Sequence, residues 1–139
     1  MFYQKFYGMR DVLGPLWGVR RAAVLPFQCR RLATAERVLV EACPSSTLKR
    51  LGLPHQNYKQ PAGGPLLRKR LRARRAIVAG LGAYVVIGPR ERRVIMRNGG
   101  GDALDAVVAA VGAARAWAEA DHRAIARHPR YPREGRLYA

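Results

Sequence analysis

The chain has few cysteines, histidines and long apolar runs, and each shortage excludes a class of protein. Its two cysteines, Cys29 and Cys43, have no CxxC spacing, so the sequence predicts no disulfide framework. The three histidines lack the spacing of a zinc site. No charge-free apolar run reaches the roughly 18 residues of a membrane helix, and the N-terminus has no signal-peptide pattern. We therefore expect a cytoplasmic protein without a membrane segment.

Acidic residues are also scarce, because nine Asp and Glu face 26 Lys and Arg for a formal net charge of +17. This balance predicts a polyanionic partner, with nucleic acid as the first candidate. Arginine greatly outnumbers lysine, and alanine and glycine are abundant, a composition that a GC-rich genome produces by codon usage alone. The charge by itself therefore leaves the partner open. The length of 139 residues suits one domain.

Apolar patterns predict short strands between helices. The clearest strand covers residues 37–44, a β-branched run closed by Pro44 and typical of a buried parallel strand. Residues 22–27 and 84–87 are shorter candidates, and residues 90–97 fit either a helix or a strand. The remaining expectations are helices over 3–13, 47–51, 66–81 and 102–120 with a possible extension over 121–126, a loop over 55–65, and a basic C-terminal tail over 127–139.

Glu41 stands at the carboxyl end of the clearest strand. In open α/β sheets, ligands gather just beyond the carboxyl ends of strands. The position makes Glu41 a candidate site residue. The alternative is an ordinary ion pair with one of the many arginines.

Three glycines at positions 99 to 101 precede the long alanine-rich helix, whose first turn carries Asp102 and Asp105. Asp102 is a favourable N-cap residue, and Asp105 shares its face and suits the helix dipole. The residues that follow leave almost no polar face, which predicts a helix buried all round. A carboxylate in that setting needs a cation, either arginine or a metal. The pair is therefore a helix cap, half of a metal site, or both.

Residues 66–81 predict a strongly basic amphipathic helix. Its apolar stripe carries Leu67, Leu71 and Val78, with Arg74 or Arg75 among them. The opposite face carries the densest positive patch of the chain, namely Arg68, Lys69, Arg70, Arg72, Arg74 and Arg75. Such a face can run beside a nucleic-acid backbone. A solvated helix face fits the same pattern, and a membrane-surface helix fits it less well.

The preceding loop offers two further nucleic-acid contacts. Lys59 could reach a phosphate, and Tyr58 could stack on a base. An ordinary surface connection explains both residues equally well. From the basic helix and this loop, the predicted nucleic-acid-binding residues are Lys59, Arg68, Lys69, Arg72 and Arg75.

Metal-dependent phosphoryl chemistry requires several carboxylates around one or two Mg²⁺ ions, which orient the attacking water and neutralise the leaving oxygen. Glu41, Asp102 and Asp105 are the right residue types, and they are the catalytic and metal-binding candidates, with Mg²⁺ or Mn²⁺ as the expected cofactor. Asp11 and Glu36 are poorly placed to complete the set. No Walker loop, GxGxxG motif or nucleophile–histidine arrangement competes with this interpretation.

Several segments carry a resemblance to a known family. They are Val-Leu-Val-Glu-Ala-Cys-Pro-Ser at 38–45, Leu-Gly-Leu-Pro at 51–54, Tyr-Lys at 58–59, Gly-Asp-Ala-Leu-Asp-Ala at 101–106 and Arg-Glu-Gly-Arg-Leu-Tyr at 133–138. Together they resemble the C-terminal two-thirds of the predicted RNase H-like nucleases grouped as domain of unknown function 429. The resemblance implies an RNase H-like α/β fold, with Glu41 as the acid at the end of the fourth strand and Asp102 and Asp105 as the acids of the final helix.

The resemblance also implies a missing part. The RNase H-like fold begins with a three-stranded sheet whose first strand carries the leading catalytic Asp, and this chain begins after it. We therefore expect residues 1–139 to form one RNase H-like domain that lacks its N-terminal three-stranded part, with few short parallel strands packed by helices. The predicted function is a metal-dependent nuclease without its first catalytic strand. The alternatives are a non-catalytic basic nucleic-acid-binding protein and an inactive α/β remnant.

Overall fold

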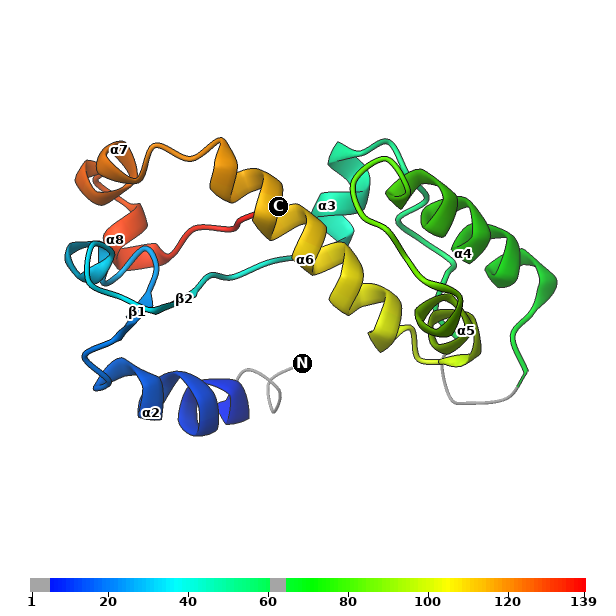
Figure 1. Cartoon of the computed structure of the whole chain (residues 1–139), viewed down its shortest axis with the longest axis horizontal. Helices are drawn as coiled ribbons and strands as arrows, with labels where there is room; N and C mark the ends of the chain where they lie inside the picture. Colours follow the sequence, from blue (N-terminus) through cyan, green and yellow to red (C-terminus); the bar gives the residue numbers. More distant parts are fainter. Residues whose placement is uncertain (1–5, 61–64) are drawn as a thin grey trace. The chain divides into compact units, whose positions relative to one another are not determined.

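A computed structural model of the chain describes residues 6–60 and 65–139 as helices and a small parallel sheet (Figure 1). The described residues form two compact units. Unit 1 runs up to Glu41 and resumes over Glu119–Leu137, and unit 2 comprises Ala42–Ala118 with Tyr138–Ala139. The mixture of helices and parallel strands agrees with the predicted α/β class. The single RNase H-like domain stays a prediction.

Unit 1 is built on a two-stranded parallel sheet. Strands β1 (Ala22–Val24) and β2 (Arg37–Leu39) pair with Ala22 opposite Arg37 and Val24 opposite Leu39. Glu41 continues the line of β2 in a single parallel bridge to Leu137. The helical elements of the unit are η1 (Gly8–Leu13, a π-helix), α2 (Gly14–Trp17), η2 (Cys29–Arg31, a 3₁₀-helix), α7 (His122–Arg127) and α8 (Tyr131–Glu134).

Both strands of unit 1 are shorter than predicted. β1 ends at Val24, before Pro26, which has no N–H to donate to a strand neighbour. The expectation that residues 37–44 form a fully buried strand is wrong, because Arg37 is exposed and the following residues of β2 are only half-buried. The helix predicted over residues 3–13 is observed from residue 6 onward, and its first residues lie outside the described part of the chain.

Unit 2 contains the helices α3 (Pro44–Arg50), α4 (Arg68–Leu81), α5 (Pro89–Arg97) and α6 (Asp102–Ala118) (Figure 1). α6 packs on α3 and α5, and α5 also packs on α4. The buried apolar core of the unit consists of Leu48, Tyr58, Ile77, Val78, Leu81, Ile95, Leu104, Val108 and Val111.

Helices α3 and α6 of unit 2 pack against each other at a glycine, Gly112. A Cβ atom placed on Gly112 would lie 2.1 Å from the Oγ1 atom of Thr47. Only glycine therefore lets the two helix backbones approach this closely. The predicted end of α3 is confirmed, since Gly52 follows its last turn with φ at +67°, a conformation that glycine adopts readily.

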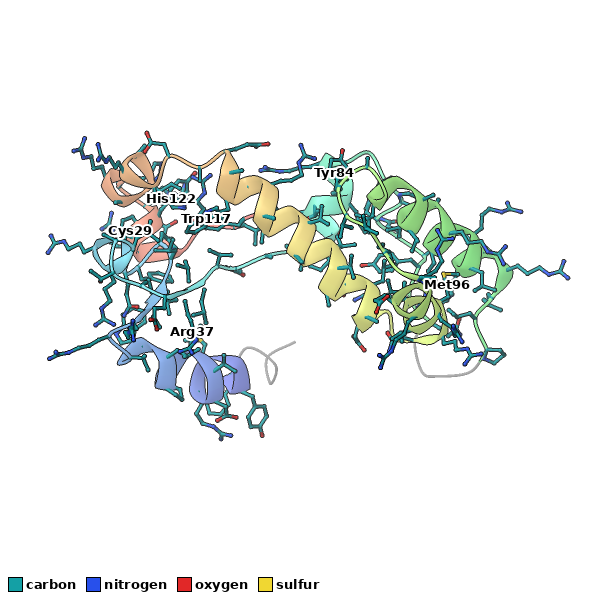
Figure 2. The ribbon with its side chains drawn as sticks, viewed as in Figure 1. Cys29, Arg37, Tyr84, Met96, Trp117 and His122 are labelled. Carbon is teal, nitrogen blue, oxygen red and sulfur yellow. The ribbon has the colours of Figure 1, made fainter. Side chains whose placement is uncertain are left out.

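The strand predicted over residues 84–87 is not observed, and this segment is irregular chain between α4 and α5. Val85 and Ile87 pack against the core, whereas Val86 is 97% exposed. The ring of Tyr84, labelled in Figure 2, lies 4.8 Å from the guanidinium carbon of Arg115. The ambiguous residues 90–97 are helical.

Two expectations about the alanine-rich helix are wrong. It is not buried all round, because Ala106, Ala110 and Ala114 form an exposed stripe. It also does not continue past residue 120. The carboxylate of Asp121 accepts hydrogen bonds from the N–H groups of Arg123 and Ala124, at 2.9 Å each, and starts a separate helix, α7. Both hydrogen bonds lower the pKa of Asp121, and the bond from the N–H group of Ala124 has the larger effect.

None of the described helices combines the length and apolar character that a membrane crossing requires. The predicted loop over 55–65 is confirmed for residues 55–60, while residues 61–64 lie outside the described residues.

Candidate functional site

The acid turn, defined as the first turn of α6 with Asp102 and Asp105, follows the glycine turn as predicted. The N-cap role expected for Asp102 is wrong, because Asp102 already lies inside the helix after Gly101, which has φ at +88°. The Oδ1 atom of Asn98 accepts the hydrogen bond from the N–H group of Ala103 instead, at 3.2 Å. Asp102 is exposed to solvent.

Asp105 is held by two neighbouring residues of the preceding loop. The hydroxyl of Tyr58 donates to Oδ1 at 2.8 Å, and the ammonium group of Lys59 pairs with Oδ2. The carboxylate side chain is 23% exposed, while that of Lys59 is 46% exposed. Asp105 therefore has a cationic partner, but this partner is a lysine and not the arginine or metal that the sequence led us to expect.

Tyr58 has a structural position and does not present its ring for stacking. Its side chain belongs to the apolar core of unit 2 and is only 5% exposed, which contradicts the expectation that it could stack on a base. Burial raises the pKa of Tyr58, and the hydrogen bond to Asp105 and the charge of Asp105 raise it further.

Arg74 is the centre of the polar network beside the acid turn. It is fully buried, in the stripe of α4 that also carries Ile77 and Val78. Its Nε atom donates to the carbonyl of Tyr58 at 2.6 Å. Nη1 donates to the carbonyls of Ile95 at 2.9 Å and Asn98 at 2.5 Å, and Nη2 donates to that of Gly99 at 2.7 Å. One side chain thus joins the loop, the end of α5 and the glycine turn.

The charge of Arg74 is stabilised mainly by carbonyl oxygens. It forms no ion pair with a carboxylate in the part of the chain that the structure describes, and burial lowers its pKa. The charge of Asp105 opposes that shift. The carbonyls of Ile95 and Asn98 lie at the C-terminal end of α5, where the helix dipole is negative and favours a cation.

The basic face of α4 is confirmed as an exposed surface. It consists of Arg68, Lys69, Arg72 and Arg75, which are all exposed. Long side chains with nitrogen tips project from α4 in Figure 2. Arg74, which the sequence placed on either face, is buried. Arg70 lies at the border and donates to the carbonyl of Lys59, so α4 and the acid turn are linked through Lys59.

Glu41 lies in unit 1, where it is exposed and lines an apolar hollow together with Gly135 and Arg136. Asp102 and Asp105 lie in unit 2. Among the described residues, no group of three or more His, Cys, Asp or Glu side chains is placed to hold a metal ion. The metal site over Glu41, Asp102 and Asp105 stays a prediction.

Sequence reasoning missed the role of Arg74. The sequence feature that could have indicated burial of Arg74 is its position in the apolar stripe of Leu71, Val78 and Leu81, where an apolar residue is usual. An arginine at such a place requires partners, but the partners are main-chain carbonyls, which no side-chain pattern reveals.

Comparison with curated proteins and with solved structures finds no significant match. A family sequence profile, described as a protein of unknown function (DUF429), matches residues 20–130. This range covers most of unit 1 and all of the helices of unit 2, including the basic face and the acid turn. The chain therefore belongs to the DUF429 family.

Proposed function

We propose that this protein binds the phosphate backbone of nucleic acid along the basic face of α4. The observation that carries the proposal is the exposure of Arg68, Lys69, Arg72 and Arg75 on one side of a helix that contains no acidic residue. Arg68, Arg72 and Arg75 follow one another at intervals of four and three residues, so they line successive turns. At 1.5 Å per residue, the row extends over about 10 Å.

The neighbouring groups support the same proposal. Arg70 adds positive charge at the border of the face, and Arg74 fixes the helix to the loop and the glycine turn without exposing its own charge. The basic face thus lies on a rigidly held helix. Contacts of this kind position a nucleic acid but do not read its sequence.

Salt dependence of binding tests the proposal. Four phosphate contacts predict that the logarithm of the binding constant for duplex DNA falls against the logarithm of the salt concentration with a slope of about −3 to −4. The Arg72→Gln/Arg75→Gln variant should lower the magnitude of the slope by about 2. The matched control is Lys49→Gln/Arg50→Gln, which removes the same charge from exposed positions at the end of α3. A flat salt response, or an equal effect of both variants, would contradict the proposal.

A second candidate function is metal-dependent phosphodiester hydrolysis, in an RNase H-like fold, with Glu41, Asp102 and Asp105 as the acids and Mg²⁺ or Mn²⁺ as the cofactor. The observation that favours it is the link from the basic face through Lys59 to Asp105, because a nuclease needs carboxylates beside the bound backbone. When bound, the metal would supply an activated water and neutralise the leaving oxygen.

The donor set fits a metal only in part. Asp102 offers a free, exposed carboxylate, but both oxygens of Asp105 already have partners. A metal ion on Oδ2 of Asp105 would have to displace the ammonium group of Lys59. The acids therefore do not form a prearranged metal site in unit 2.

Thermal stability in the presence of Mg²⁺ or Mn²⁺ tests this second candidate. A bound ion should raise the melting temperature, and Asp102→Asn should abolish the increase. Asp11→Asn, an equal change of charge at an exposed position in η1, is the control. If neither ion stabilises the protein or the Asp102→Asn variant responds like the wild type, the metal site is excluded. Cleavage of single-stranded and duplex substrates with each ion then tests the hydrolysis itself.

A further inference from the structure

A hollow whose lining residues carry polar groups lies in unit 2 beside the acid turn. It has a volume of about 470 Å³, which is within the range of about 300–1,000 Å³ of small-molecule sites. We call it the loop hollow, and its lining residues are His55, Gln56, Asn57, Tyr58, Lys59 and Arg70.

Three polar side chains of the loop hollow are available to a ligand. Within the described residues, His55, Gln56 and Asn57 form no side-chain hydrogen bond. An amide offers both donors and acceptors, and so does a neutral imidazole. Such groups match the edge of a nucleobase, which also alternates donors and acceptors. The backbone of Asn57 is left-handed, with φ at +57°. Asparagine tolerates this conformation better than most residues other than glycine, so an amide side chain can stand at this position.

The charges of the hollow are of one sign and are held in place. Among the residues that the structure describes, Lys59 and Arg70 are the charged residues of its lining, and no carboxylate lines it. The ammonium group of Lys59 is anchored on Asp105, and the guanidinium of Arg70 is anchored on the carbonyl of Lys59. Arg70 belongs to α4, so the hollow adjoins the basic face.

We infer that the loop hollow accepts one unpaired nucleotide, with its phosphate near Lys59 and Arg70 and its base against His55, Gln56 and Asn57. The inference rests on the proposed backbone binding by α4 and adds a preference for unpaired nucleic acid. In a duplex the base is stacked and its pairing edge is occupied, so the amides can read only a base that is unpaired or turned out of the stack.

Fluorescence anisotropy with a labelled single strand and a duplex of the same length tests the inference. The Gln56→Ala/Asn57→Gly variant removes both amides, and glycine keeps the left-handed backbone at position 57. We expect this variant to bind the single strand about tenfold more weakly than the wild type, with a change of less than about twofold for the duplex. The Arg72→Gln/Arg75→Gln variant should weaken binding of both nucleic acids alike.

The outcomes separate this inference from the proposed function. If the amide variant binds both nucleic acids as the wild type does, or loses both equally, the loop hollow is not a nucleotide site, while salt-dependent binding through α4 still stands. If the wild type shows no salt-dependent binding, both are overturned. If a nucleoside monophosphate competes with the single strand, the hollow takes a free nucleotide. If it does not compete while the amide variant still shows the tenfold effect on the single strand, the nucleotide must be part of a strand. Circular dichroism confirms that each variant is folded.

Discussion

Replacing Arg74 by methionine should destabilise unit 2, and the size of the effect follows from the carbonyls that lose a donor. Of the four carbonyls that Arg74 contacts, that of Asn98 also accepts from the N–H group of Gly101, and that of Gly99 also accepts from Gln60. The carbonyls of Tyr58 and Ile95 have no other donor among the described residues. Two orphaned carbonyls at about 1–3 kcal/mol each give a loss of about 2–6 kcal/mol.

A favourable term works in the opposite direction. Methionine is apolar and suits a position among apolar residues. Burying it also avoids the free-energy cost of removing a guanidinium from water. For this reason, apolar replacements of buried charges are neutral or stabilising in some other proteins. We therefore expect a net loss near 3 kcal/mol for Arg74→Met. Arg74→Lys should lose less, because an ammonium group still donates to some of the carbonyls but cannot reproduce the planar fork of the guanidinium.

Urea unfolding followed by circular dichroism measures this effect. The control is Arg75→Met, the same substitution one residue later on the exposed face of α4, which should change the free energy of unfolding by less than about 0.5 kcal/mol. Hydrogen exchange of the N–H groups near the end of α5 should quicken in Arg74→Met and not in the control. If Arg74→Met is as stable as the wild type, the carbonyl network does not hold unit 2 together.

Three further predictions concern unit 2. Gly112→Ala should lower the free energy of unfolding by about 1–3 kcal/mol in a denaturant titration, although alanine favours helix more than glycine does. Adding Thr47→Ala should recover most of this loss, because it removes the hydroxyl that clashes with the new Cβ atom. If the effects of the two substitutions simply add, this explanation is wrong. The pKa of Tyr58 is raised in the folded state, so above pH 10 the unfolded chain loses the phenol proton while the folded protein keeps it. The contribution of Tyr58 to the free energy of unfolding is therefore full below pH 10 and decreases as the pH rises above it. Tyr58→Phe should make this alkaline decline shallower in melting curves, and an unchanged decline would exclude Tyr58 as its source. Gly101→Ala should be destabilising by about 1–3 kcal/mol in thermal melts, because alanine is strained at a φ of +88° and its Cβ atom would lie 2.8 Å from Cγ of Lys59; wild-type stability would show that the turn adapts freely.

The sequence predicted the elements that depend on local signals. The helix that ends before Gly52, the basic helix and the alanine-rich helix follow from periodicity, glycine and helix-forming residues, and all three are observed. The strand predicted for residues 84–87 is not observed, because apolar, β-branched residues also suit irregular extended chain. A strand forms only where another strand pairs with it. Here Val85 and Ile87 are held by the core instead.

The candidate site could be predicted only in part. The exposed basic face agrees with the expectation drawn from the residues, whereas the pairing of Lys59 with the acid turn was not predicted. The buried arginine network was not predictable, because Arg74 depends on carbonyls that tertiary packing brings together from residues 58, 95, 98 and 99. The capping role of Asn98 was missed for a related reason, since it lies five positions before the N–H group that it caps.

The division of the chain into two units has a consequence for folding during synthesis. Unit 2 is almost complete once Ala118 has been made, and only its last two residues, Tyr138 and Ala139, come later. Unit 1 also includes α7 and α8, so its first segment cannot complete its packing until these two helices have been made. During that delay the strand residues Ala22–Val24, which are buried in the finished protein, lack part of their unit. Unit 1 therefore keeps apolar residues uncovered for longer during synthesis than unit 2 does.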